Sequence, residues 1–359
     1  MPTIVSRTFY PIFKTFVISS CHTLKYLSFF KQNLQKIFCK PISSQVNNSP
    51  LRSSNQKKHF IQHDIHQLPI TYPHFLSKFS SIYQRIRAAK KIGIVLIWTI
   101  LCMPFQSLFI KLPGSAKINF ARFYWRNVSR ILGLDLRIFG KLAEQKHQAS
   151  SQKRPIIYIV NHTSWLDIPS IGGLVPGAFV AKEEIGSWPV ISTLCRLGRV
   201  LFVSRQRQST IKEQQTMERR LEEGGNLILF PEGTSTEGSH LAPFLSSFFV
   251  LAKPIAKNVA YPIPIIQPIS VVYDRLGMLP VNRFRRPIYS WYGDMELTPH
   301  LWDFCKWSDM RASIIYHQPL YPEDFKNRKQ LSKKTWDIIA TGTAYLRQGK
   351  SDEDIKKII

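Results

Sequence analysis

The sequence is short of acidic residues and of cysteines. Its 359 residues include 23 Asp and Glu against 49 Lys and Arg, which gives a net charge of +26. The five cysteines are odd in number and form no Cys-x-x-Cys pair, which argues against a disulfide framework or a zinc knuckle and favours a reducing compartment. The chain also lacks a heptad repeat and a Gly-x-y period, which excludes coiled-coil and collagen folds.

Acidic residues are scarcest near the N-terminus. Residues 1–91 contain 14 Lys and Arg and a single acid, Asp64. Lys14 interrupts the first apolar stretch, so we expect residues 1–80 to be a basic, poorly ordered leader and not a membrane span. A transit segment would have the same composition. The charge surplus favours a polyanionic partner such as nucleic acid, anionic lipid or an acidic protein.

A long apolar run follows the leader. Residues 92–110 are 19 uncharged residues, about 28 Å as a helix. A single membrane span, an interfacial or re-entrant helix pair and a buried core helix all fit this length. Lys91 and Lys111 flank the run and Pro104 interrupts it, which favours a segment in the membrane interface. We therefore assign residues 81–125 to a membrane-associated helical segment.

The remaining sequence alternates between strand and helix patterns and is apolar enough to form a core. Short continuous apolar runs predict strands that are buried on both faces, which requires helices on both sides of a sheet. We expect one α/β domain over residues 126–350. The predicted strands cover 156–160, 178–181, 199–204, 226–230, 263–273 and 312–317, and the predicted helices cover 211–223 and 327–346. The prolines in 263–273 suggest an edge strand or a bulge.

The first candidate site follows the first of these strands. The segment NHTSWLD places His162 and Asp167 in an H-x4-D arrangement, and ligands of open α/β sheets bind beyond the carboxyl ends of strands. The carboxylate would fix the imidazole tautomer and leave the other ring nitrogen free to take a proton. A structural histidine at a helix cap is the alternative. His59 and Asp64 have the same spacing without a preceding strand.

Two further segments offer polar groups at strand ends. The segment FPEGTSTEG, residues 230–238, exposes backbone N–H groups and hydroxyls that suit an anion, although an ordinary polar turn has the same composition. It is neither a P-loop nor a G-x-S-x-G elbow. Arg205 follows another strand and could bind phosphate or simply face solvent. His59, His63 and His66 lack the additional ligands that a metal site would need.

Four motifs in one order carry a family resemblance. NHTSWLD, FVSR, FPEGTS and IPIIQPI resemble the glycerolipid acyltransferase family, which includes the 1-acyl-sn-glycerol-3-phosphate acyltransferases of bacterial membranes. The resemblance covers about residues 156–273. It implies that a fatty acyl group moves from acyl-CoA or acyl carrier protein to the hydroxyl of a lysophospholipid. The expected acceptor is 1-acyl-sn-glycerol-3-phosphate, which gives phosphatidic acid.

The resemblance also implies residue roles. His162 would be the general base and Asp167 its orienting partner, with no covalent acyl-enzyme, no metal and no cofactor beyond the thioester co-substrate. The residues implied to hold the acceptor's phosphate are Lys182, Arg205, Glu232, Gly233 and Thr234. Many family members have Arg after Glu-Gly-Thr, where this chain has Ser235. That difference leaves room for another acceptor, such as lyso-ornithine lipid.

The implied partners are a lysolipid, an acyl thioester and an anionic membrane surface. Acyl thioesters are cytosolic, so we expect the enzyme on the cytoplasmic face of the inner membrane. A single span with its basic end inside would place His162 on the wrong side, so residues 92–110 should lie in the interface or re-enter. A non-enzymatic basic protein that binds membrane or nucleic acid is the alternative. Nucleic acid is not expected, because no zinc finger or RNA-recognition signature is present.

Overall fold

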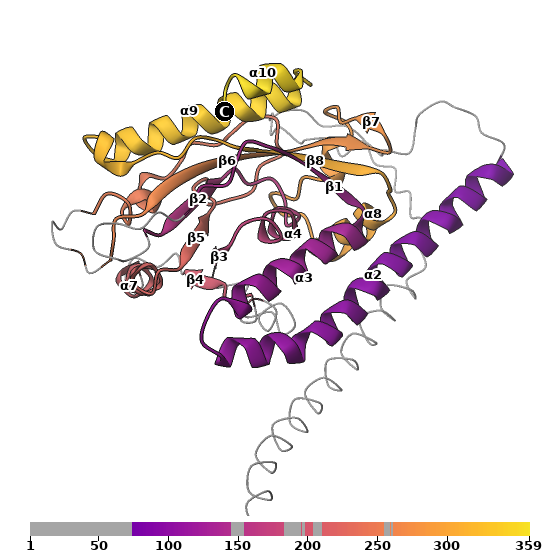
Figure 1. Cartoon of the computed structure of the whole chain (residues 1–359). Coiled ribbons are helices and arrows are strands. Elements are labelled where there is room, and N and C mark those ends of the chain that lie inside the picture. The colour runs from indigo at the N-terminus through magenta and orange to yellow at the C-terminus, as the bar shows by residue number, and fades with distance from the viewer. Residues whose placement is uncertain are drawn as a thin grey trace, which may run out of the picture. The chain divides into compact units, whose positions relative to one another are not determined.

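One mixed sheet forms the centre of the structure, which is a computed structural model (Figure 1). The structure describes residues 74–144, 154–182, 195, 198–203, 210–254, 259 and 261–359. Residues 1–73, which make up most of the predicted leader, lie outside this part of the chain. The sheet order is β1 (Leu134–Phe139), β8 (Met310–Tyr316), β6 (Ile265–Leu276), β2 (Ile156–Val160), β5 (Asn226–Leu229), β3 (Gly177–Lys182) and β4 (Leu201–Val203), with β7 (Leu279–Pro280) paired to β6.

Strand β2 lies in the middle of the parallel part of the sheet. It pairs in parallel with both β5 and β6, while β8 joins the other side of β6 in the antiparallel direction. All five residues of β2 are buried, because helices cover both faces of the sheet. This burial explains the continuous apolar run IIYIV. The predicted α/β sheet flanked by helices is confirmed.

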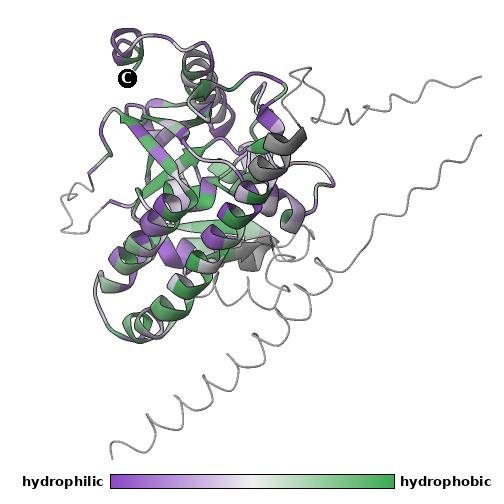
Figure 2. Cartoon of the chain, turned by 90° about the vertical axis from the view of Figure 1, so that its right-hand side faces the viewer, coloured by the Kyte–Doolittle hydropathy of each residue, from purple (hydrophilic) through white to green (hydrophobic). Residues whose placement is uncertain are grey.

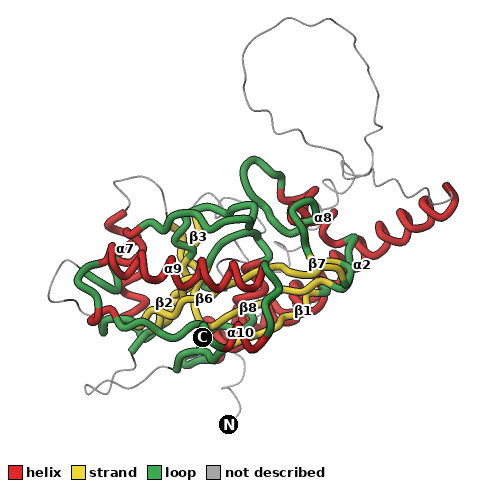
Figure 3. The backbone as a smooth tube through the Cα atoms, turned by 90° about the horizontal axis from the view of Figure 1, so that it is seen from above, coloured by secondary structure: helices red, strands yellow, loops and turns green. Residues whose placement is uncertain are grey.

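Alternate residues of β2 face two different helical layers. Tyr158 belongs to the same apolar cluster as Val128 of α3 and Phe304 of α8, whereas Ile157 packs in the cluster that contains Ile339 of α9. Figure 1 shows α9 and α10 on one side of the sheet and α2 and α3 on the other, and Figure 3 shows α9 lying over β6. The helices are α2 (His74–Lys111), α3 (Ala116–Leu132), α4 (Asp167–Gly172), α7 (Thr210–Glu222), α8 (Leu297–Cys305), α9 (Arg328–Arg347) and α10 (Asp352–Lys356).

The proline-rich strand is central, so of the two predicted alternatives the edge strand is wrong; its ladder with β8 does contain a bulge-like register shift, between Tyr273 and Arg275. Pro268 lies within β6, opposite Ile159 of β2. The ladder between β6 and β8 begins only at Ile269, and the carbonyl of Pro268 accepts a hydrogen bond from the backbone N–H of His317 beyond the end of β8. Proline is tolerated here because its missing N–H faces the side where the β8 ladder has not yet started.

Helix α2 continues through Pro104 as one helix and packs against α3 and α8. The Lys91 ammonium donates to the carbonyls of Leu132 at 2.5 Å and Trp307 at 2.7 Å, which joins α2 to the ends of both helices. By length and composition, Ser81–Lys111 could cross a membrane, yet only 17% of its most apolar window is buried. A buried core helix is therefore excluded.

The exposed side of α2 is apolar. Figure 2 shows hydrophobic residues along α2 and α3. Large apolar side chains that remain 40–60% exposed in water are costly unless another apolar phase covers them. Within the apolar run of residues 92–110, the exposed large apolar residues are Ile94, Ile97, Ile100, Leu101, Phe105 and Leu108.

Candidate active site

His162 and Asp167 meet in the loop that follows β2. The Nδ1 atom of His162 lies 2.8 Å from Oδ2 of Asp167, and the carboxylate side chain is completely buried while the imidazole is 20% exposed. Because a carboxylate only accepts hydrogen bonds, Nδ1 carries the proton and donates it to Asp167. This tautomer leaves Nε2 as the nitrogen that can take a proton from a substrate.

Three other donors hold the Asp167 carboxylate. The backbone N–H groups of Thr163 and Ser164 donate to Oδ2 at 2.8 and 3.0 Å, and the Tyr273 hydroxyl from β6 donates to Oδ1 at 2.7 Å. Burial and the nearby Asp167 charge raise the pKa of Tyr273 well above its ordinary value, so this phenol stays a donor. Four donors on one carboxylate stabilise its negative charge in an otherwise desolvated position.

The loop after β5 forms hydrogen bonds with the backbone of His162. Glu232 accepts from the N–H of His162 at 2.6 Å and from that of Ala242 at 2.9 Å, and burial raises its pKa to about 7. The N–H of Thr236 donates to the His162 carbonyl at 3.0 Å. The imidazole stacks on Phe230 with ring centroids 4.2 Å apart. The ring is thus fixed by its own loop and by the neighbouring one.

A third segment, around residues 287–300, supports the same loop. The N–H of Trp291 donates to the Thr163 carbonyl at 2.9 Å, and the indole of Trp165 donates to Nδ1 of His300 at 3.0 Å. The Nε2–H of His300 lies 3.1 Å from the carbonyls of Pro287 and Ser290. Burial lowers the pKa of His300, so this histidine remains neutral and acts as a structural bridge between α8 and the site.

The structure brings most of the sequence-predicted residues to one end of the sheet. Gly233 adopts a φ of +69° in the turn directly after β5, where its N–H donates to the Phe230 carbonyl, and Thr234 is exposed beside it. Lys182 is the last residue of β3 at the same edge. Arg205 lies outside the described residues. Sequence reasoning missed Tyr273 and His300.

Within the described part of the chain, no group of three His, Cys, Asp or Glu side chains is placed to hold a metal ion. His59, His63 and His66 fall outside that part. The cations near the site are the Lys and Arg side chains of the surrounding loops and helices. The His162–Asp167 contact is an arrangement that can support proton transfer by the imidazole.

The fold and the site define an α/β protein with a histidine–carboxylate pair in the loop that follows its central strand β2. The model of the acyltransferase family matches residues 141–272. The crystal structure of the 1-acyl-sn-glycerophosphate acyltransferase PlsC from Thermotoga maritima superposes with a TM-score of 0.54 at 18% identity, covering 75% of this chain and 98% of that one. That similarity shows a shared fold.

Curated relatives define the family more closely. Lyso-ornithine lipid O-acyltransferase of Brucella abortus is 32% identical over 232 residues, which are 64% of this chain and 84% of that protein. The Rhizobium meliloti protein of the same name is 30% identical over 243 residues, or 67% and 80% of the two chains. A 1-acyl-sn-glycerol-3-phosphate acyltransferase of Neisseria meningitidis is 30% identical over 153 residues, or 41% and 53%.

The chain therefore belongs to the lysolipid acyltransferases, and the resemblance drawn from its motifs is confirmed. It is an O-acyltransferase that takes a lysolipid as acceptor, and its exposed apolar helix indicates membrane association.

Proposed function

We propose that this enzyme transfers a fatty acyl group from a thioester to the free hydroxyl of lyso-ornithine lipid, with His162 as the general base. The observation that carries the reaction is the contact between His162 and the buried carboxylate of Asp167, which leaves Nε2 available. Four relatives with 27–32% identity, named lyso-ornithine lipid O-acyltransferases, support this acceptor ahead of the 1-acyl-sn-glycerol-3-phosphate expected from the motifs.

The proposed reaction needs no covalent enzyme intermediate. Nε2 of His162 takes the hydroxyl proton as the oxygen attacks the thioester carbonyl, and Asp167 stabilises the imidazolium that results. The tetrahedral intermediate collapses with loss of the thiolate, which takes from the imidazolium the proton that came from the acceptor hydroxyl. An ester bond forms, a thioester bond breaks, and the histidine returns to its starting state.

Glu232 has a different role in this proposal from the phosphate contact expected from the sequence. Both of its oxygens already accept backbone N–H groups, one of them from His162. A carboxylate in that position fixes the general base and offers nothing attractive to an anion. We keep Lys182, Arg205, Gly233 and Thr234 as the groups beside the acceptor's polar headgroup.

The proposed setting is the cytoplasmic face of an anionic inner membrane, where acyl-CoA or acyl carrier protein delivers the donor. Helix α2 is attached to α3 and α8 along its length, which supports an interfacial or re-entrant position over a lone crossing. The proposed division is a leader over residues 1–80, a membrane segment over 81–125 and an acyltransferase domain over 126–350, although α2 already begins at His74 and α10 lies past residue 350. Sealed vesicles with the cytoplasmic side inside should protect the domain from added protease, and its digestion would contradict this setting.

A panel of acceptors tests the proposal. Purified full-length protein in detergent receives a labelled acyl thioester together with lyso-ornithine lipid, 1-acyl-sn-glycerol-3-phosphate or a lysophospholipid with another headgroup. We expect product from lyso-ornithine lipid at the highest kcat/KM, and none from the His162→Ala protein above background. The second candidate acceptor is 1-acyl-sn-glycerol-3-phosphate, favoured by the 30% identity to the Neisseria enzyme. Faster acylation of that lipid would replace the proposed acceptor.

A further inference from the structure

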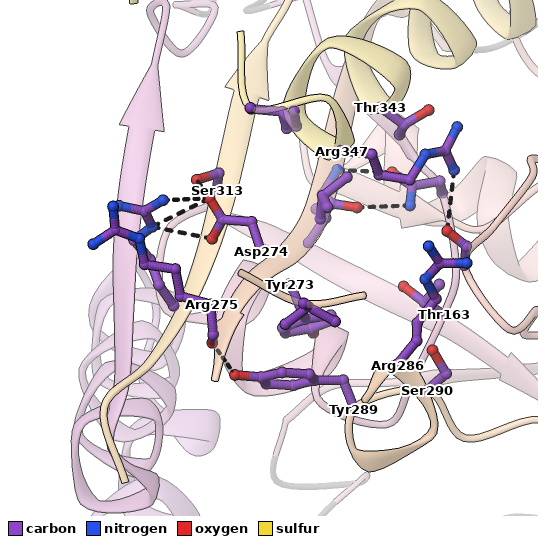
Figure 4. Close-up of a pocket in the computed structure, with 18 of the residues that line it drawn as sticks. Thr163, Tyr273, Asp274, Arg275, Arg286, Tyr289, Ser290, Ser313, Thr343 and Arg347 are labelled. Atoms are coloured by element: carbon purple, nitrogen blue, oxygen red, sulfur yellow. Dashed lines mark hydrogen bonds and ion pairs between the residues drawn. The ribbon is translucent and has the colours of Figure 1, made fainter. Parts of the chain in front are cut away.

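A cavity of about 320 Å³ adjoins the His162–Asp167 pair on the side of β6 and α9 (Figure 4). Three of its lining residues contact that pair directly: Thr163, Glu232 and Tyr273. The opposite wall comes from the C-terminal part of the chain, including Arg347 of α9. None of the motifs identified in the sequence accounts for this wall.

The cavity wall is strongly basic. Its charged residues are Arg137, Arg275, Arg286, Arg311, Arg347 and Lys350 against Glu232 and Asp274. Some of this charge is neutralised within the protein. Arg311 forms a two-pronged ion pair with Asp274, with Nη2 to Oδ2 at 2.6 Å, and Arg137 pairs with Asp352 of α10. Among the other basic residues of the lining, Arg286 and Arg347 lie on the side of the cavity away from the Arg311–Asp274 pair (Figure 4).

Arg286 and Arg347 are the central pair on that side. In Figure 4 they lie on neighbouring walls, one on the 3-10 turn Arg286–Ile288 and the other on α9. Arg347 donates to the carbonyl of Gly238 at 3.0 Å, and within the described residues neither guanidinium forms an ion pair with a carboxylate. Both side chains are partly buried, so their mutual repulsion is screened less than it would be in water.

The charges around Arg347 also favour an added anion. Burial and the positive charge of Arg286 lower its pKa, while Glu237 acts in the opposite direction. The Glu237 carboxylate itself lies 2.7 Å from Nδ1 of His240 and also accepts from Ser239. An anion between the two guanidiniums would relieve this repulsion.

Thr163 supplies an independent observation. Thr163 lines the cavity and is only 7% exposed, and its Oγ1 has no hydrogen-bond partner within the described part of the chain. A buried hydroxyl without a partner is costly, unless a ligand or water satisfies it. Gly238 packs closely against Thr163: a Cβ added to this glycine would lie 2.8 Å from the Thr163 methyl carbon.

We propose that Arg286, Arg347 and Thr163 form an anion site that holds a carboxylate or phosphate group in this cavity. Guanidinium forks match both groups, and a hydroxyl can add a third hydrogen bond. The anion has two sources: the acidic group of the acceptor lipid's headgroup, or a free phosphate. The first source rests on the proposed function, whereas the second does not.

Binding of inorganic phosphate tests the site without any turnover. Full-length protein in detergent is titrated with phosphate at constant ionic strength, and binding is followed by phosphorus NMR line broadening. We expect Arg286→Gln and Arg347→Gln to weaken binding about tenfold or more, since each removes a charge-assisted contact. Arg283→Gln is the matched control, because Arg283 is exposed in the same segment and stacks over Phe284.

Equal phosphate affinity of Arg286→Gln, Arg347→Gln and the Arg283→Gln control would overturn the site. Arg347→Gln also removes the hydrogen bond to Gly238, so its melting temperature is compared with the control. Arg286→Gln needs no such allowance, because its guanidinium forms no ion pair with the described residues. Retained phosphate binding in a protein that fails to acylate lyso-ornithine lipid would disprove the proposed acceptor and leave the anion site standing.

Steady-state kinetics separate the two sources. If the headgroup occupies the site, phosphate competes with the lysolipid, and Arg286→Gln raises KM about tenfold with kcat within about twofold. If free phosphate occupies it, phosphate changes kcat without competing, and Arg286→Gln abolishes that response. Both patterns support the site. A protein whose turnover is insensitive to phosphate and to Arg286→Gln would contradict it.

Discussion

Two regions of the molecule contrast in burial. The loops after β2 and β5 bury polar groups, whereas the surface of α2 exposes apolar ones. Asp167 is completely buried, yet four donors surround its carboxylate. Ile97 and Leu101 are apolar, yet 60% and 57% of their surface is exposed. The first region has lost water and replaced it with protein hydrogen bonds. The surface of α2 is not covered by the described part of the protein, and its apolar side chains contact the surrounding water or lipid.

The two regions differ in the source of their stabilising contacts. Removing one partner from a buried hydrogen-bonded carboxylate costs about 1–3 kcal/mol, so the polar region is stabilised from within the protein. Moving the exposed part of an Ile or Leu such as Ile97 or Leu101 into an apolar phase yields about 1–2 kcal/mol, which α2 gains only from a partner outside the chain. Catalysis and membrane attachment should therefore respond to different mutations.

The largest expected effect is on catalysis. His162→Ala should reduce kcat by about 10²–10⁴-fold, because it removes the proposed general base. Binding to vesicles should stay at the wild-type level, since the loop after β2 is separate from the exposed surface of α2. Turnover assays and vesicle sedimentation on the same preparation measure both properties. An active His162→Ala protein with wild-type rates would disprove the mechanism.

The next effect concerns the membrane. Ile97→Glu combined with Leu101→Glu should weaken binding to anionic vesicles by at least about tenfold, because two apolar contacts become charged. Activity on acceptor dissolved in detergent should persist. Lys333→Glu on the exposed side of α9 is the control for the change in charge. Equal sedimentation of both variants would show that α2 does not contact the bilayer.

A smaller effect is expected at the buried phenol. Tyr273→Phe removes one donor from Asp167 and should lower kcat several-fold to about tenfold, with a loss of about 1–3 kcal/mol in stability. KM for the lysolipid should change little, because the hydroxyl acts on the orientation of Asp167. The pH dependence of kcat is the decisive readout, since a purely structural role would leave its midpoint unchanged.

The smallest effect is a pH dependence of stability. Burial raises the pKa of Glu232 to about 7 from its usual 4.5, so folding binds a proton between these values. The stability linked to this group is complete below pH 4.5 and is lost as the pH rises towards 7. The melting temperature of wild type relative to Glu232→Gln should fall by a few degrees between pH 4.5 and 7.5, because the amide does not titrate. A constant difference would show that the carboxyl has its ordinary pKa.

The sequence identified the strands whose burial is continuous and the site residues that are close in the chain. The runs at 156–160 and 226–230 correspond to β2 and β5, because a strand covered on both faces must be apolar throughout. His162 and Asp167 were recognisable from their spacing after such a strand. The edge strand β1 was not predicted, since LDLRIF places Asp135 and Arg137 among its apolar residues.

Residues that join the site through the sheet order were not predictable from local pattern. Tyr273 reaches Asp167 because β6 lies next to β2, although 106 residues separate them in the chain. His300 acts through Trp165, across a similar distance along the chain. Arg347 comes from a helix that reads as an ordinary closing helix. Each contact depends on which elements become neighbours, and a run of apolar residues does not encode that order.

The Lys91 ammonium binds the carbonyls of Leu132 at the end of α3 and of Trp307 just after α8, so α2 is attached to the domain at both places. A helix attached in this way does not move independently of the domain. For an enzyme that rests on a bilayer through α2, the height of the catalytic imidazole above the lipid is then constant. An acceptor lipid must then extend its hydroxyl from the bilayer to this height. The length of its polar portion decides whether the hydroxyl reaches the imidazole.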